Sequence, residues 1–228
     1  MKKYTRICAR IDLDAIEYNL EMMRRRLPSD TKMIGVIKMD GYGHGAAQIA
    51  KYVMEEKDYI WGYAAATPDE AALLRKKGIQ KPILVLGCTF PEQRDEMIRQ
   101  EIRMTCYTEE MARDVSERAG RLGKTAYIHI KLDTGMSRLG FLISEESADA
   151  IARAAGLPGI EAEGMFTHFS KADETDKAFT RGQMEKYLWM KARLADRGVA
   201  FKLCHCSNSA GIIDMPEAAM DVVRAGIA

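Results

Sequence analysis

The chain has 228 residues, of which 47% are hydrophobic and 29% are charged, a composition typical of a globular domain with a substantial core. Its 34 basic and 33 acidic residues give a net charge of +1, and no basic block stands apart, which argues against nucleic acid as the main partner. No apolar run reaches membrane-spanning length and residues 1–12 lack a signal-peptide core, so a cytoplasmic protein without membrane segments is expected.

The five cysteines are odd in number and scattered, which does not indicate a disulfide framework. Two of them flank a histidine in the run Cys204-His205-Cys206. In an extended strand the two thiols point to one face and the imidazole to the other, so the three side chains cannot close on one ion. No metal site is therefore expected.

Helix and strand signals alternate from end to end, which favours a parallel sheet with helical crossovers. After a strand-like piece at 5–11, strands are expected at 33–37, 59–64, 82–86, 104–106, 126–132, 160–166, 201–205 and 222–225. Helices are expected at 13–26, 46–56, 68–77, 91–101, 109–122, 144–155, 180–197 and, poorly signalled, 209–219. Asp12 is placed to cap the first helix, and the run from Thr67 to Glu70 reads as a capping box.

Eight strands, each preceded by a helix, predict an α/β fold of the TIM-type (α/β)8 barrel class that begins on a helix. No linker or internal repeat interrupts the pattern, so residues 1–228 are expected to form one domain. The strand at 126–132 has an apolar and a polar face. In a barrel the polar face, which carries His129 and Lys131, would point inward toward a site.

The stretch from Met33 to Gly45 draws attention because an apolar run ends abruptly at Lys38, and Tyr42 follows among three glycines. A desolvated lysine at the end of a buried strand can lose its proton and form a Schiff base with a carbonyl compound. On this segment alone, a solvated lysine before an ordinary loop is the simpler interpretation.

Residues that follow the strands of such a barrel gather at one rim, where these folds place their sites. The candidates there are Lys38, Tyr42, Arg138, His168, Asn208, Ser209, Arg224, Gly226 and Ile227. Ser209 at a helix start and the amides near Gly226 suit a phosphate group, and the whole set suits a phosphorylated aromatic aldehyde. Taken singly, Arg138 can be a surface ion-pair partner and His168 a core histidine.

Five motifs in this order resemble those of alanine racemases, and the resemblance covers essentially the whole chain, from CARIDLDAIEYNL through MDVVRAGIA. They are VIKMDGYGHG, HIKLDTGMSRLG, MFTHFSKAD, HCSNSAG and VRAGIA. The resemblance implies the barrel of the family's N-terminal type, with pyridoxal 5′-phosphate (PLP) as cofactor.

The same resemblance implies a role for each candidate residue. Lys38 would hold PLP through a Schiff base, with Asn208 in the same cofactor site. The phosphate would be contacted by Tyr42, Ser209, Gly226 and Ile227. Arg138 would bond the phenolic oxygen, and Arg224 would face the pyridine nitrogen with His168 packed behind it. Lys131 matches a lysine that is carbamylated in some members and then holds the residue matching Arg138.

The implied activity is that of an isomerase that interconverts L- and D-alanine, which supplies D-alanine for peptidoglycan. Lys38, Arg138 and His168 would be its catalytic residues, with Lys38 as one of two bases. The second base would be a tyrosine from the second domain of the partner subunit in a homodimer. That C-terminal β domain is not part of this sequence, so the chain is expected to be the cofactor-binding half. A guanidinium at the pyridine nitrogen cannot readily give up a proton, which favours racemisation over transamination.

Two other interpretations are open. A single-domain PLP-binding or PLP-homeostasis protein shares this barrel and about this length, but the motifs HIKLDTGMSRLG and GYGHG look like the racemase branch. A barrel enzyme that uses a lysine without PLP would leave Arg224 and Ser209 unexplained. The choice between alanine, serine and other amino-acid substrates stays open.

Overall fold

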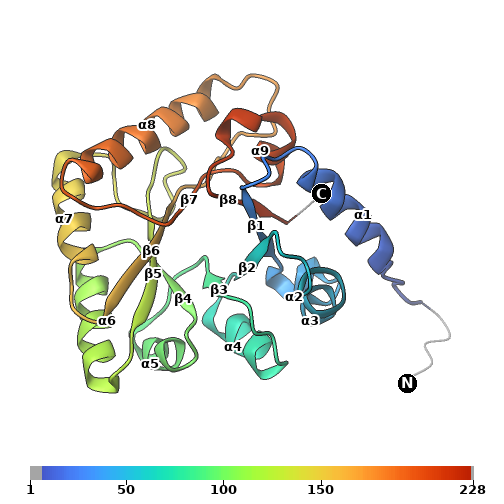
Figure 1. Ribbon diagram of the computed structural model, residues 1–228, viewed down its shortest axis with the longest axis horizontal. Helices are drawn as coiled ribbons and strands as arrows, with labels where there is room; N and C mark the ends of the chain where they lie inside the picture. The colour runs from blue at the N-terminus through green and yellow to red at the C-terminus, as the bar shows by residue number, and fades with distance from the viewer. Residues whose placement is uncertain (1–6, 227–228) are drawn as a thin grey trace.

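Parallel strands alternate with helices throughout the computed structural model, which describes residues 7–226 (Figure 1). The strands are β1 (Lys32–Val36), β2 (Ile60–Ala65), β3 (Ile83–Val85), β4 (Arg103–Cys106), β5 (Ala126–Lys131), β6 (Ile160–Phe166), β7 (Leu203–His205) and β8 (Val222–Ala225). The helical segments within residues 7–226 are α1 (Leu13–Arg24), α2 (Lys38–Tyr42), α3 (Ala46–Ile49), α4 (Pro68–Lys76), α5 (Pro91–Arg99), α6 (Glu109–Leu122), α7 (Glu145–Ala155), α8 (Ala178–Ala195) and α9 (Ser209–Asp214). A π-helical turn η1 (Ala50–Met54) follows α3, and a 3-10 turn η2 (Pro216–Ala218) follows α9.

The eight strands form one parallel sheet in the order β7-β6-β5-β4-β3-β2-β1-β8, so β7 and β8 meet at a seam. At this seam, isolated hydrogen bonds replace the regular backbone pairing of neighbouring strands. The backbone N–H of Arg224 donates to the Ser207 carbonyl oxygen at 3.0 Å. The N–H of Cys204 donates to the Asp221 carboxylate at 2.8 Å. The TIM-type barrel that the sequence predicts is therefore confirmed, nearly closed, with one irregular joint.

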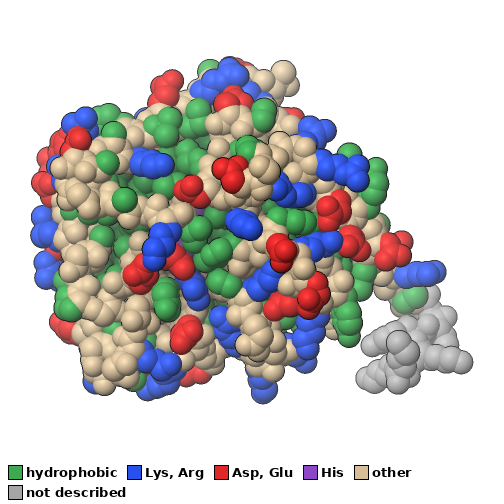
Figure 2. Space-filling view, viewed as in Figure 1, with side chains coloured by type: hydrophobic (Ala, Val, Ile, Leu, Met, Phe, Trp, Pro, Cys, Tyr) green, Lys and Arg blue, Asp and Glu red, His purple; other side chains and the backbone are tan. Residues whose placement is uncertain are grey.

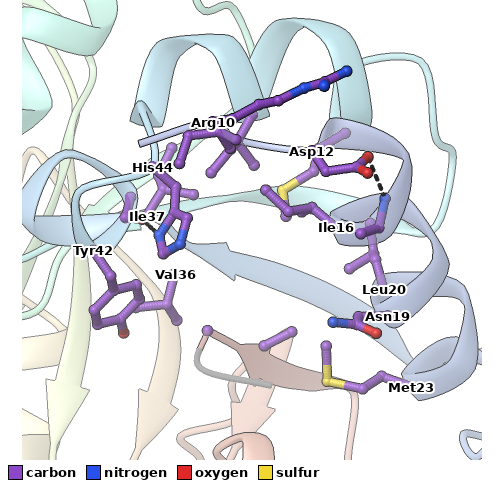
Figure 3. Close-up of a pocket in the computed structure, with 17 residues that line it drawn as sticks. Arg10, Asp12, Ile16, Asn19, Leu20, Met23, Val36, Ile37, Tyr42 and His44 are labelled. Atoms are coloured by element: carbon purple, nitrogen blue, oxygen red, sulfur yellow. Dashed lines mark hydrogen bonds between the residues drawn. The ribbon is translucent and has the colours of Figure 1, made fainter. Parts of the chain in front are cut away.

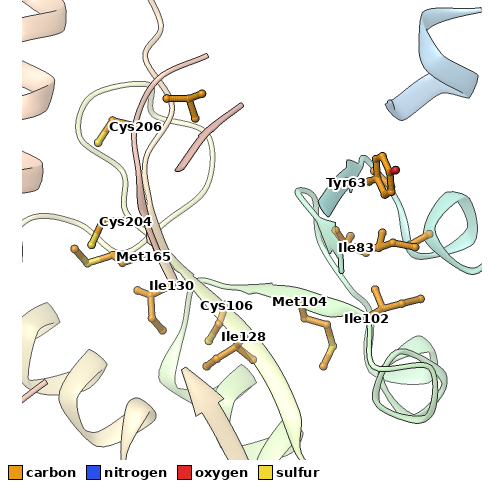
Figure 4. Close-up of a cluster of buried hydrophobic side chains, with 14 of the residues drawn as sticks. Tyr63, Ile83, Ile102, Met104, Cys106, Ile128, Ile130, Met165, Cys204 and Cys206 are labelled. Carbon is orange, nitrogen blue, oxygen red and sulfur yellow. The ribbon is translucent and has the colours of Figure 1, made fainter. Parts of the chain in front are cut away.

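The main core lies between the sheet and the outer helices, and Figure 4 shows part of it. Ile128 and Ile130 of β5 pack there with Cys204 and Cys206, all fully or almost fully buried. The intervening His129 is buried on the opposite, inner face of β5, as the period-2 pattern predicts. Inside the barrel, a small apolar cluster of Ile34, Ala64 and Val222 fills the space below the rim.

The predicted elements agree with the structure apart from a few differences. Residues 7–11 form no strand, because they are largely exposed and have no partner edge; Thr5 and Arg6 lie outside the described residues. The helix expected at 46–56 changes from α to π geometry at Ala50. There the N–H of Glu55 donates to the Ala50 carbonyl oxygen at 2.8 Å, one residue further along than in an α-helix, and the Glu55 carboxylate accepts from the Tyr63 hydroxyl at 2.6 Å.

The surface carries both signs of charge in alternation, and Figure 2 shows basic and acidic side chains mixed over the visible face. Within residues 7–226, no helix combines the length and the apolar composition that crossing a membrane requires. In the same part of the chain, no group of three or more His, Cys, Asp or Glu side chains is arranged to hold a metal ion.

The close approach of β2 to the start of β3 predicts a sharp cost for a methyl group at Gly62. A Cβ there would lie 2.3 Å from the Pro82 carbonyl oxygen, whereas a Cβ on Gly120 in α6 would meet nothing within 4 Å. We expect Gly62→Ala to lower the free energy of unfolding by about 1–3 kcal/mol. Gly120→Ala, the matched control, should raise it by roughly 0.5–1 kcal/mol. Urea unfolding measures both, and equal effects would contradict the packing described for β2.

Candidate active site

A cavity of about 790 Å³ opens at the rim formed by the carboxyl ends of the strands. Eight of the nine predicted site residues line it: Lys38, Tyr42, Arg138, His168, Asn208, Ser209, Arg224 and Gly226. The ninth, Ile227, lies outside the described residues. The sequence interpretation missed other lining residues, among them Leu86, Gly87, Phe166, Phe169, Ser170 and Asp173. Several of these also follow strands, so the rim rule that found the first set could have found them.

Lys38 is followed at once by a left-handed turn of the backbone. Met39, Asp40, Gly41 and Tyr42 have φ values of 54°, 52°, 63° and 57°. The sequence predicts a tight glycine turn here. It does not predict positive φ values in the three non-glycine residues Met39, Asp40 and Tyr42. Left-handed helical geometry costs about 1–2 kcal/mol for each such residue, so other contacts must hold the segment.

Backbone hydrogen bonds and one side chain provide part of that restraint. Within the turn, the N–H of Gly43 donates to the Met39 carbonyl oxygen at 2.9 Å, and that of Gly45 donates to the Asp40 carbonyl oxygen at 2.8 Å. The Asp40 carboxylate accepts from the N–H of Ala46 at 2.9 Å, where α3 begins. The turn thus has one fixed shape, and it places the Lys38 ammonium 5.9 Å from the centre of the Tyr42 ring.

Tyr42, Ser209 and Gly226 form a small polar group on one side of the cavity. The N–H of Gly226 donates to Ser209 Oγ at 3.0 Å, which leaves the serine hydroxyl hydrogen available for another acceptor. A Cβ on Gly226 would lie 2.9 Å from the Tyr42 hydroxyl oxygen, so the backbone approaches the phenol closely. Burial raises the pKa of Tyr42, which keeps the phenol protonated as a donor.

Asn208 is held by contacts with its own surroundings. Its side-chain oxygen accepts from the N–H of Gly211 at 3.0 Å and so caps α9, and its amide nitrogen donates to the Phe169 carbonyl oxygen at 3.3 Å. These two bonds fix the start of α9, and with it the position of Ser209.

Arg224 is 3% exposed and reaches the cavity from β8. One terminal nitrogen of its guanidinium donates to His205 Nδ1 at 2.8 Å. The other donates to the carbonyl oxygens of Thr167 and Cys206, each at 2.9 Å. Among the described residues, no acceptor contacts Nε–H, which is therefore available to a ligand. Burial lowers the pKa of Arg224 to about 10, so the group is still a cation at neutral pH.

A buried chain of hydrogen bonds runs from Arg224 into the barrel. Because a guanidinium only donates, His205 Nδ1 must accept and His205 carries its proton on Nε2. That N–H donates to His129 Nδ1 at 3.0 Å, and His129 Nε2 faces the Glu163 carboxylate at 3.4 Å. Burial alone would raise the pKa of Glu163, but hydrogen bonds from His129 and Arg103 lower it to about 2. Both histidines are neutral, in agreement with the lowering of their pKa values by burial.

His168 lies next to Arg224, with its Nδ1 3.4 Å from a terminal nitrogen of the guanidinium. Burial and the positive charges of Arg224, Arg138, Lys131 and Lys38 lower the pKa of His168 to about 3. The imidazole is therefore neutral and a weak base at physiological pH, and its place beside Arg224 matches the predicted one.

Arg138 is exposed at the mouth of the cavity, on a loop that the Asp133 carboxylate organises by accepting from the N–H groups of Gly135, Ser137 and Arg138. Among residues 7–226, no side chain forms an ion pair with its guanidinium. Lys131 does not contact it and instead donates to the Leu132 carbonyl oxygen at 2.6 Å. Burial and the charges of Arg224 and Arg138 lower the pKa of Lys131 to about 8.

A second cavity, of about 370 Å³, lies behind Tyr42 and Gly226, which line both cavities. Figure 3 shows Tyr42 and His44 on one side of it and Ile16 and Leu20 of α1 on the other. The lining is mainly apolar, so the polar groups that suit a phosphorylated ligand are concentrated in the larger cavity.

The three buried neutral histidines His129, His168 and His205 predict a loss of stability in mild acid. Their folded-state pKa values lie below the usual 6.5, so the unfolded chain binds more protons once the pH falls below that value. The stabilisation is complete above pH 6.5 and is lost as the pH falls. Between about pH 7.5 and 5.5 the neutral His168, whose folded-state pKa is about 3, should cost roughly 1.4 kcal/mol, and His205 and His129 should add to the loss in the same direction.

Urea unfolding of the chain at the two pH values measures this loss. His168→Asn should reduce the loss by roughly 1.4 kcal/mol. A free energy of unfolding that does not change over this range would contradict the neutral state of the three imidazoles.

Comparison with known proteins identifies the family. Residues 11–228 match the family model described as alanine racemase, N-terminal domain. The alanine racemase of Clostridium tetani is 42% identical over 97% of this chain and 56% of its own length. That of Methanococcus maripaludis is 40% identical over 97% of this chain and 59% of its own length. The chain thus spans somewhat more than half the length of these curated relatives.

Solved structures agree with the sequence comparison. Alanine racemase of Clostridium difficile 630 in complex with cycloserine has a TM-score of 0.93 and 43% identity, over 95% of this chain and 59% of that chain. Alanine racemase of Bacillus anthracis with bound L-Ala-P has a TM-score of 0.89 and 32% identity, over 96% of this chain and 56% of that chain. The predicted resemblance is confirmed, and the chain belongs to the alanine racemase family as its N-terminal barrel domain.

Proposed function

We propose that the natural protein carrying this chain is a PLP-dependent alanine racemase, and that the chain is its cofactor-binding barrel. The observation that carries the proposal is the shared cavity, into which Lys38, the buried Arg224 and the group of Tyr42, Ser209 and Gly226 all converge. The names of the relatives support the same conclusion. Because the chain covers little more than half of them, the activity of the whole protein is an inference from its half of the site.

The donor set of the cavity fits PLP. Lys38 offers a primary amine for an aldehyde, and the hydroxyls of Tyr42 and Ser209 offer hydrogen-bond donors for a phosphate group. The free Nε–H of Arg224 can donate to a ring nitrogen that carries no proton of its own. The cavity volume of about 790 Å³ is within the usual range for cofactor sites.

PLP, when bound, supplies an electron sink that eases removal of the α-proton of an amino acid. The residues of the chain would divide the remaining work. Lys38 Nζ, as a free amine, can take the α-proton on one face and return it. Arg224 gives up its own proton poorly, so it would keep a neighbouring ring nitrogen unprotonated. An unprotonated ring withdraws electrons less strongly, which favours return of the proton to the α-carbon over transamination.

His168 and Arg138 would help to orient the bound ligand. The neutral His168 packs against Arg224 without adding a competing charge, and the unpaired guanidinium of Arg138 can bind an anionic oxygen at the mouth of the cavity. The second base, a homodimeric assembly and a cytoplasmic location stay expectations from the resemblance. The relatives and structures described above are all alanine racemases, which supports the racemase over a single-domain PLP-binding protein.

The proposal predicts covalent attachment of PLP to Lys38. After incubation of the natural protein with PLP and reduction with borohydride, peptide mapping should find the label on Lys38. The same protein should convert L-alanine into D-alanine, and Lys38→Ala should lower that rate by at least about 10²–10⁴-fold, the usual effect of losing a positioned acid–base group.

Lys186→Ala on the exposed part of α8 is the matched control, and it should change neither the label nor the rate. Label on another lysine, or none on well-folded protein, would overturn the assignment of Lys38. Label on Lys38 without racemisation would instead favour the single-domain PLP-binding interpretation.

A further inference from the structure

Glu70 makes contacts that the sequence does not predict. As the third residue of α4 it was expected to complete a capping box by accepting from the backbone N–H of Thr67. Half of that box exists, since the N–H of Glu70 donates to Thr67 Oγ1 at 3.3 Å. The Glu70 carboxylate, however, accepts from the N–H of Ala66 at 2.8 Å and from the N–H of Met39 at 3.0 Å. It therefore ties the end of β2 to the segment that follows β1.

The Met39 contact bears directly on Lys38. The N–H of Met39 belongs to the peptide group that joins Lys38 to Met39, so a partner for this N–H fixes the orientation of that peptide plane. The plane is also where the left-handed turn begins, because Met39 is the first of the residues with positive φ.

Packing does not provide this restraint. The Met39 side chain is 64% exposed, so it contributes little to holding its own backbone in an unfavourable conformation. Two described carboxylates bind the backbone N–H groups at the two ends of this segment. Asp40 holds the far end through Ala46, and Glu70 holds the near end through Met39. Without Glu70 the N–H of Met39 would lose its one acceptor among the described residues. The near end would then be held only by the backbone bonds from Gly43 to Met39 and from Gly41 to Ile37, against the preference of its residues for negative φ.

We propose that Glu70 is a positioning residue for Lys38, which fixes the direction of its side chain by holding the peptide group between Lys38 and Met39. The inference rests on the proposed role of Lys38 in covalent attachment of PLP. Its consequence is specific. Loss of Glu70 should impair bond formation at Lys38 Nζ and leave the contacts from Tyr42, Ser209 and Arg224 to the rest of the ligand in place.

Two ligands separate these effects in the natural protein freed of cofactor. PLP can form a bond with Lys38, whereas pyridoxamine 5′-phosphate has the same ring and phosphate but no aldehyde. We expect Glu70→Ala to reduce the ratio of PLP affinity to pyridoxamine 5′-phosphate affinity by about 10-fold or more, the effect of one lost hydrogen bond to a charged group. Glu70→Gln keeps one carbonyl acceptor, so it should fold readily and restore part of the ratio.

Thr67→Ala is the matched control, because it weakens the same helix start without touching Met39. It should lower the melting temperature and leave the affinity ratio within about twofold of the unmodified protein. An unchanged ratio in both Glu70 variants, or equal weakening of the two ligands, would overturn the positioning role. Absence of covalent PLP in the unmodified protein would overturn the proposed function of Lys38 and this inference with it.

Discussion

The buried guanidinium of Arg224 is the interaction on which the rest of the site depends. A charge inside a protein is costly unless hydrogen bonds compensate most of its lost hydration. Here the acceptors are the carbonyl oxygens of Thr167 and Cys206 together with His205 Nδ1, which come from the ends of β6 and β7. The backbone N–H of Arg224 also joins β8 to Ser207 where the sheet has no ladder. Arg224 thus helps to close the barrel through its backbone and brings a cation to the cavity through its side chain. The closure of the seam and the position of that cation are therefore linked.

Because the guanidinium of Arg224 can only donate, it sets which atoms donate and which accept along the buried chain of hydrogen bonds. Because Arg224 donates, His205 accepts at Nδ1 and donates from Nε2 to His129 Nδ1. His129 Nε2 in turn faces the Glu163 carboxylate, which lies away from the rim. That carboxylate is paired with Arg103, and among the described residues no carboxylate contacts Arg224 itself. The rim keeps an excess of positive groups in Lys38, Lys131, Arg138 and Arg224. Such a cavity suits an anionic, phosphorylated ligand and keeps His168 neutral.

Much of this architecture could be predicted from the sequence, because it depends on local patterns. Alternation along β5 placed His129 and Lys131 inside, and the rim rule brought residues as distant as Lys38 and Arg224 into one cavity. What escaped prediction depends on contacts between distant segments. Nothing local marks Met39 for left-handed geometry, and Asp40 is of a residue type that adopts it only occasionally. Glu70 looked like an ordinary capping residue, because its partner Met39 lies on a different βα loop.

The central role of Arg224 can be tested through the tautomer of His205, observed by nitrogen NMR on histidine-labelled protein around neutral pH. We expect a neutral imidazole with its proton on Nε2, because Arg224 donates to Nδ1. The ring should not take up a second proton in mild acid, because burial and the charge of Arg224 hold its pKa well below the usual value. A proton on Nδ1, or a ring that becomes charged near pH 6.5, would show that Arg224 does not organise the seam and the cavity as described.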